Sequence, residues 1–326
     1  MLSPVLKLLS PSGSDARLTT LIFHRVLPRA DPLFPDEIDA QRFDAICGWV
    51  AQWFNVLPLD EAVQRLRDGE LPARALAITF DDGYADNHDV ALPILQRHGL
   101  SATFFIATGF LDGGRMWNDT VIESVRQCRS PTLDLEGIGI SDLALLDVSD
   151  AAQRRAAIDA ILMAIKYLPA EERLRLAERI AGCTGGARLP HDLMMCSDHV
   201  RALHRSGMQI GAHTVSHPIL ARLSDAPARA EIGDSKRWLE GLLDESVDLF
   251  AYPNGRPGQD FTDRDAALAR EAGFTAAVST VKGVAHAATD PYRIPRFTPW
   301  DRSKLRFGIR LATNLRSPVA EGSAIA

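Results

Sequence analysis

The chain has 326 residues, 46% of them hydrophobic and 24% charged, which is typical of a globular protein with a large core. Its net charge of −6 and the lack of a basic run argue against nucleic acid as a partner. Four scattered cysteines without a Cys-x-x-Cys pair indicate reduced thiols. The apolar run within residues 1–14 is broken by Pro4, too short for a membrane span and weak as a signal peptide. We therefore expect a cytoplasmic protein without a transmembrane span, at most loosely associated with the inner membrane, and leave the oligomeric state open.

Short apolar runs of strand character alternate with stretches of helical spacing along most of the chain. The expected strands are 18–23, 76–80, 102–108, 208–212, 247–251, 274–279 and 293–297. The helices expected between them are 39–53, 59–67, 90–97, 197–204, 227–243 and 263–272. Repeated strand-then-helix units favour a single (β/α) barrel over two domains. We place this barrel at 18–310, after an irregular lead-in at 1–17 and before a loose tail at 311–326.

The pattern changes between about 110 and 195. Helices are predicted at 117–128, 151–168 and 170–180, and an extended stretch at 133–140. The two later helices are amphipathic and rich in Ala, Leu, Glu and Arg. Because no polar motif follows a strand here, we interpret the segment as a mostly helical insertion into the barrel.

Two adjacent carboxylates follow the apolar run 76–80, where Asp81 and Asp82 precede Gly83. Polar side chains at the carboxyl end of a buried parallel strand lie at the edge where α/β folds build their sites. Neighbouring carboxylates repel each other unless a cation or a shared proton lies between them. On its own, this motif is equally compatible with a solvated turn.

A pair of histidines follows another predicted strand, with His213 and His217 four residues apart in one loop. Alone, such a pair is often structural. Combined with Asp82 it gives two imidazoles and one carboxylate, a donor set for zinc or iron that leaves positions open for water and substrate. Asp81 would then be free to act as a base on the bound water.

Three stretches together resemble a known family. They are Thr79-Phe80-Asp81-Asp82-Gly83, His213-Thr214-Val215-Ser216-His217 and Phe250-Ala251-Tyr252-Pro253-Asn254-Gly255. They are similar to the first three motifs of the polysaccharide deacetylase family, the NodB-homology or carbohydrate esterase 4 group. The resemblance covers roughly 18–307 apart from the insertion. It implies a distorted (β/α)7 barrel that hydrolyses the acetamide of an N-acetylated sugar, or sometimes an acetate ester.

The resemblance also implies roles for individual residues. Asp81 matches the general base, and Asp82, His213 and His217 match the ligands of a divalent metal, usually zinc. The backbone N–H of Asn254 matches the donor to the oxyanion. The implied partner is a carbohydrate, either an N-acetylated glycan or its precursor.

Two departures from the family pattern concern the base and the acid. Many members carry an arginine where this chain has Ala251, and either Arg293 or Arg296 could supply the guanidinium. The histidine that many members carry near the C-terminus is also missing. His24, at the end of the first predicted strand, is the better candidate for the acid, because it resembles the strand-end histidine of biofilm poly-N-acetylglucosamine deacetylases. A structural histidine is the alternative.

Other candidates have less support from the sequence. Tyr84 is expected to bind substrate or to close the turn, and Thr214 to support the histidine loop. Tyr252 and Pro253 are expected to contact substrate or to support the loop of the third motif. Trp117 could stack on a sugar ring, although a buried position at a helix start is favoured. An O-acetyl esterase, a cyclic-amide hydrolase and an inactive carbohydrate-binding protein remain alternatives.

Overall fold

The computed structural model describes residues 2–140, 143–185 and 188–317. The contacts divide the chain into two units, which are described separately. The first unit is drawn from Met1–Arg29, Ile38–Asp112 and Met195–Ala326, and the second from Ala30–Glu37 and Gly113–Met194. The segment predicted as an insertion therefore forms a unit of its own, together with the short stretch before the helix at 40–53.

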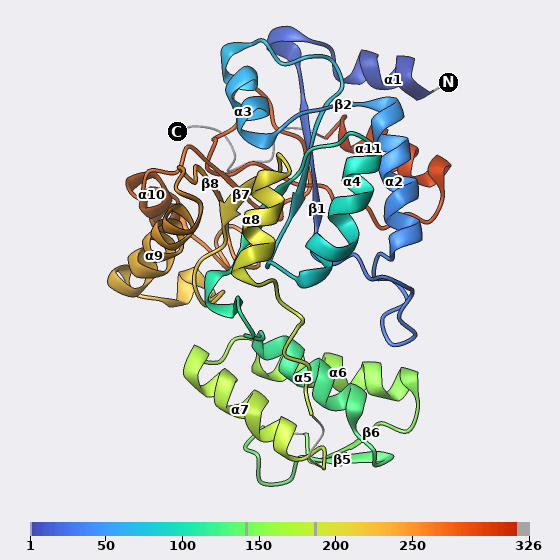
Figure 1. Cartoon of the computed structure of the whole chain (residues 1–326), viewed down its shortest axis with the longest axis vertical. Helices are drawn as coiled ribbons and strands as arrows, with labels where there is room; N and C mark the ends of the chain where they lie inside the picture. The colour runs from blue at the N-terminus through green and yellow to red at the C-terminus, as the bar shows by residue number, and fades with distance from the viewer. Residues whose placement is uncertain (1, 141–142, 186–187, 318–326) are drawn as a thin grey trace. The chain divides into compact units, whose positions relative to one another are not determined.

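The first unit is built on a parallel sheet of seven strands among the described residues (Figure 1). The strands are β1 (Leu18–Phe23), β2 (Asn55–Val56), β3 (Ala75–Phe80), β4 (Thr103–Ile106), β7 (Gln209–Ala212), β8 (Leu249–Ala251) and β9 (Ala276–Val278). Their order is β1-β3-β4-β7-β8-β9, with β2 also paired to β3. The segment 293–297, predicted as a strand, forms only isolated bridges, from Ile294 to Val278 and from Phe297 to Leu21. This segment links β9 to β1, so the sheet curls into the predicted distorted (β/α) barrel.

Helices surround the sheet (Figure 1). They are α1 (Leu2–Leu9), α2 (Ala40–Trp53), α3 (Leu59–Asp68), α4 (Leu92–Arg97), α8 (Ser197–Arg205), α9 (Asp225–Leu243), α10 (Asp263–Glu271) and α11 (Lys304–Asn314). The lead-in predicted to be irregular thus contains a helix, because Pro4 falls in its first turn, where no backbone donor is needed. Residues 311–314, expected in a loose tail, end α11, while 318–326 lie outside the described residues.

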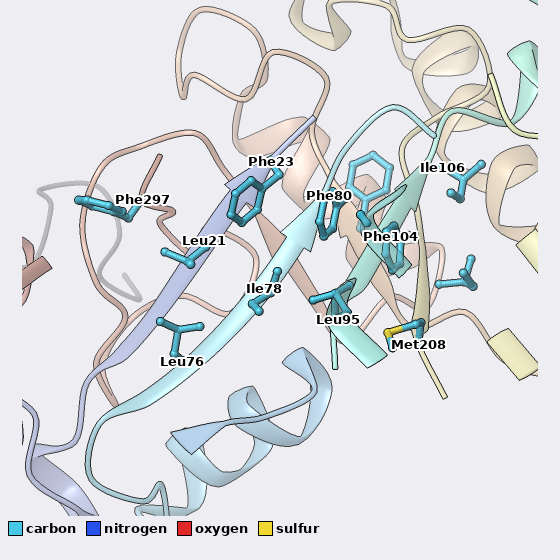
Figure 2. Close-up of a cluster of buried hydrophobic side chains, with 14 of the residues drawn as sticks. Leu21, Phe23, Leu76, Ile78, Phe80, Leu95, Phe104, Ile106, Met208 and Phe297 are labelled. Atoms are coloured by element: carbon cyan, nitrogen blue, oxygen red, sulfur yellow. The ribbon is translucent and has the colours of Figure 1, made fainter. Parts of the chain in front are cut away.

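Large and small side chains divide between the two faces of β3. Leu76, Ile78 and Phe80 pack in the layer between the sheet and the helices, whereas Ala75 and Ala77 belong to the barrel interior. Figure 2 shows the outer layer, in which the Phe80 ring stacks on Phe104 with 4.7 Å between centroids. Because Phe80 directly precedes Asp81, this packing fixes where the carboxylate motif leaves the sheet.

The second unit has its own hydrophobic core. Its elements are α5 (Trp117–Gln127), β5 (Thr132–Asp134), β6 (Leu145–Asp147), α6 (Ala151–Ile165) and α7 (Ala170–Gly182), with β5 and β6 antiparallel. The stretch expected to be extended over 133–140 is a strand only at its start. Among the helices that the structure describes in either unit, none is long and apolar enough to cross a membrane.

Candidate active site

The carboxylates of Asp81 and Asp82, in the turn after β3, have different surroundings. Asp81 continues the strand, since its N–H donates to the Phe23 carbonyl at 2.9 Å. Asp82 adopts the left-handed conformation with φ +77°, which aspartate tolerates better than most residues, and Gly83 follows at φ +91°. Both aspartates are buried. Backbone strain of this kind is common at functional sites, where the surrounding structure holds it in place.

Asp81 is held by Arg296. The two guanidinium nitrogens Nη1 and Nη2 donate to the two carboxylate oxygens at 2.7 Å each, and Arg296 is 1% exposed. Arg296 also donates to the Ser279 carbonyl at 2.8 Å and to Thr79 Oγ1 at 3.2 Å. Burial alone would raise the pKa of Asp81, but the charge of Arg296 lowers it overall. Asp81 is therefore a buried carboxylate kept ionised in a fixed orientation.

The two candidate arginines thus have different environments. Arg296 reaches Asp81, whereas the half-buried Arg293 pairs with Asp263 and Asp290. The sequence alone left this choice open. At the position of the missing arginine, the Ala251 carbonyl accepts a hydrogen bond from His213 Nδ1 at 2.7 Å.

Asp82 faces both histidines of the second motif. Its Oδ1 atom lies 3.4 Å from Nε2 of His213 and 3.4 Å from Nε2 of His217. Among the described residues, this buried Oδ1 has no hydrogen-bond partner. Zinc bonds of about 2.0–2.1 Å in a tetrahedral arrangement separate ligand atoms by about 3.3 Å. The three side chains thus fit a divalent metal in both donor type and spacing.

The electrostatics of this triad also favour a cation. Burial lowers the pKa of His217 to about 4, so this imidazole is neutral at pH 7 and has a lone pair to offer. Burial would also lower the pKa of His213, but the carboxylates of Asp82 and Asp81 raise it overall. Burial raises the pKa of Asp82, yet the neighbouring His213 and His217 lower it overall. The two carboxylates therefore attract positive charge to this point.

Glu231 of α9 holds the loop between the two histidines. Its carboxylate accepts hydrogen bonds from the N–H groups of Val215 and Ser216 at 2.9 and 2.8 Å, and from the Ser216 hydroxyl at 2.6 Å. Inside the same loop, Thr214 Oγ1 accepts from the His217 N–H at 3.1 Å. Thr214 and His217 both have positive φ, 66° and 52°. Glu231 therefore stabilises a strained loop, and sequence reasoning missed it because it is one acidic residue within a predicted helix.

His24 follows β1, the strand beside β3, and is exposed. Phe23 pairs with Phe80 in the sheet, so His24 and Asp81 follow paired residues of two neighbouring strands. The loops after β1 and β3 are joined, since Asn87 Nδ2 donates to the His24 carbonyl at 2.8 Å. Asp86 adds an ion pair with Arg25 at 2.8 Å.

The two tyrosines predicted at the site, Tyr252 and Tyr84, are both buried. Tyr252 is fully buried, donates to the Tyr292 carbonyl at 3.0 Å and stacks on Phe261, so its side chain supports the loop from the core. The buried Tyr84 ring is covered by the Arg25 guanidinium at 4.7 Å.

The loop of the third motif is tightly turned. Pro253 is buried, and Asn254 has φ +60°. Thr280 braces this turn, because its hydroxyl donates to the Asn254 carbonyl at 2.8 Å. The backbone at Asn254 is thus fixed in a conformation that few residues adopt.

Trp117 lies in the second unit, where it begins α5 and is half-buried. The guanidinium of Arg173 lies 4.9 Å from the centre of its ring. The side chain is therefore packed within that unit.

Comparison with known proteins agrees with this fold. Residues 68–131 and 176–277, just over half of the chain, match the polysaccharide deacetylase family. The chain therefore belongs to this family of carbohydrate esterases, hydrolases that act on N-acetyl amide bonds. It is 18% identical to YxkH of Bacillus subtilis (strain 168) over 283 residues, which is 86% of this chain and 71% of that protein.

Three solved structures share the fold. The deacetylase PplD of Streptococcus pyogenes, in complex with acetate, superposes with a TM-score of 0.60 at 18% identity, covering 93% of this chain and 99% of that one. IcaB from Ammonifex degensii gives 0.59 at 17% identity, covering 94% and 99%. A de-N-acetylase from Aggregatibacter actinomycetemcomitans gives 0.53 at 17% identity, covering 86% and 94%.

Proposed function

We propose that this protein is a metal-dependent deacetylase that hydrolyses the acetamide of an N-acetylated sugar in a glycan or glycan precursor. The observation that carries the proposal is the separation of the two adjacent carboxylates. Both oxygens of Asp81 accept hydrogen bonds from Arg296. The Oδ1 atom of Asp82, which has no hydrogen-bond partner within the described part of the chain, faces two imidazole nitrogens. One carboxylate is thus arranged as a base and the other as a ligand.

Asp82, His213 and His217 would hold a divalent metal, most readily zinc. Such an ion supplies Lewis acidity toward water and the acetyl carbonyl. Asp81, ionised and oriented by Arg296, accepts the proton that the attacking water loses. The backbone N–H of Asn254 donates to the oxyanion that forms on the carbonyl. His24 gives its proton to the departing nitrogen as the C–N bond breaks, so the products are acetate and a free amine.

The preference for an amide over an ester rests on the family and on fold relatives such as the de-N-acetylase. Acetate release is measured from N-acetylglucosamine oligosaccharides and, in parallel, from O-acetylated sugars, with zinc content determined on the same preparation. We expect bound metal and acetate release from the N-acetylated substrates. Metal binding with release only from the esters would make the protein an O-deacetylase, and a protein that binds no divalent metal would contradict the proposal.

A further inference from the structure

Helix α11 and the segment before it expose apolar and basic side chains. Of the ten large apolar residues that are exposed in the described part of the chain, five lie in α1 or between 300 and 309. Trp300, Leu305 and Ile309 are 67%, 71% and 53% exposed. We define the α11 face as these three residues together with the exposed Arg306 and Arg316. So many exposed apolar side chains in one short stretch indicate an interaction surface.

The spacing of the apolar residues in α11 places the exposed and the buried ones on opposite sides of the helix. Phe307 and Leu311 are buried, whereas Leu305 and Ile309, four residues apart, lie together on the opposite side. The sequence of α11, Lys304–Asn314, contains no acidic residue. Asp301, the only acidic residue between 300 and 316, pairs with Arg310. The face is therefore apolar and basic, although the chain as a whole is acidic with a net charge of −6.

Helix α1 also exposes both apolar and basic side chains. It contacts α11 (Figure 1). It exposes Val5 by 47% and Leu8 by 82% next to the exposed Lys7. Its Leu6 is buried and anchors the helix to the core. Two neighbouring helices thus expose leucine, valine and isoleucine beside basic side chains.

We propose that the α11 face binds the surface of an anionic lipid bilayer. Apolar side chains of an amphipathic helix enter the headgroup boundary, while arginine and lysine attract anionic headgroups and tryptophan favours the interface. A second copy of the chain is a poorer occupant, because a symmetric contact would bring two basic faces together. The contact would be peripheral, since none of the described helices could cross a membrane.

Co-sedimentation with lipid vesicles tests the proposal. Vesicles of phosphatidylcholine mixed with phosphatidylglycerol should retain the full-length protein, and vesicles of phosphatidylcholine alone should retain much less. Added salt should weaken the binding. In the double variant Leu305→Glu/Ile309→Glu, the partition coefficient should fall by at least about tenfold for each side chain replaced. Arg306→Gln should lower it by about fivefold.

A matched control variant introduces two glutamates in the second unit instead of on the α11 face. Met163 and Leu174 are 78% and 50% exposed in the second unit, and Met163→Glu/Leu174→Glu should leave vesicle binding unchanged. The α11 double variant should still release acetate from a soluble oligosaccharide, so this test is independent of the proposed reaction. Failure of the wild-type protein to bind the anionic vesicles, or equal losses in the two double variants, would overturn the proposal. Self-association through Leu305 and Ile309 without vesicle binding, measured by analytical ultracentrifugation, would assign the face to a second copy instead.

Discussion

Replacing Arg296 by glutamine should separate the positioning of the base from metal binding. Arg296 donates to both oxygens of Asp81, and the two side chains are only 0% and 3% exposed. The variant keeps a polar side chain, although a shorter one, and removes the charge. Asp81 would then be a buried carboxylate without its cation, while the contacts of Asp82 with the histidines would remain.

The size of the effect follows from the burial of the pair. Breaking a buried ion pair by removing one partner costs about 3–5 kcal/mol. Arg296 currently lowers the pKa of Asp81 against the opposing effect of burial, so its removal must raise that pKa. A base with a raised pKa is protonated at higher pH, and the acid limb of the kcat/KM profile should therefore move to higher pH. Loss of an oriented base should lower kcat by about 10²–10⁴-fold.

The assay is acetate release across pH, combined with metal content and denaturant unfolding. Arg293→Gln is the matched control, because Arg293 pairs with Asp263 and Asp290 and not with Asp81, and its pair with the 93% exposed Asp263 contributes about 0–1 kcal/mol. We expect Arg296→Gln to retain metal, lose stability and shift the acid limb, and Arg293→Gln to resemble the wild type. Identical pH profiles and stabilities for the two variants would refute the role given to Arg296.

Three further predictions concern the acid, the histidine loop and the metal. His24→Ala should lower kcat by about 10²–10⁴-fold with unchanged metal content, and unaltered turnover would contradict its role as the acid. Glu231→Gln should weaken zinc binding roughly tenfold to a hundredfold, because a carboxylate that holds the ligand loop is lost, whereas Glu245→Gln at a 65% exposed position should not. Dialysis against a chelator should abolish acetate release and added zinc should restore it; activity that survives complete metal removal would exclude the metal-dependent reaction.

The fold class was predictable because the barrel repeats a local pattern. The strands β1, β3 and β7 are short, rich in apolar or β-branched residues and followed by polar side chains, and packing preserves those local signals. The sequence did not predict helix α1, because Pro4 interrupts its apolar run. A proline in the first turn of a helix is nevertheless tolerated.

The choice between Arg293 and Arg296 depends on tertiary pairing. Ile294 pairs with Val278 and faces the barrel interior, so Arg296, two residues further along an extended segment, faces the same way. Arg293 faces the other side. The alternation of side chains between the two faces of an extended segment would have selected Arg296 if the register of 293–297 had been known. Isolated bridges, however, leave no clear alternation of apolar and polar residues in the sequence.

Glu231 had no local signal at all. Its carboxylate accepts hydrogen bonds from two N–H groups that lie 16 and 15 residues earlier in the chain. The helical spacing of α9 does not predict which loop such a glutamate will contact. Such contacts exist only once α9 packs beside β7.

The most direct test of the account is a comparison of Asp81→Asn with Asp82→Asn, measuring zinc stoichiometry and acetate release on the same samples. Asp81→Asn should keep its metal and lose turnover, because only the base is removed. Asp82→Asn should lose affinity for the metal itself, since the amide is a poorer ligand than the carboxylate. If both variants lost zinc equally, or if Asp81→Asn remained active, the division of roles between the two carboxylates would be wrong.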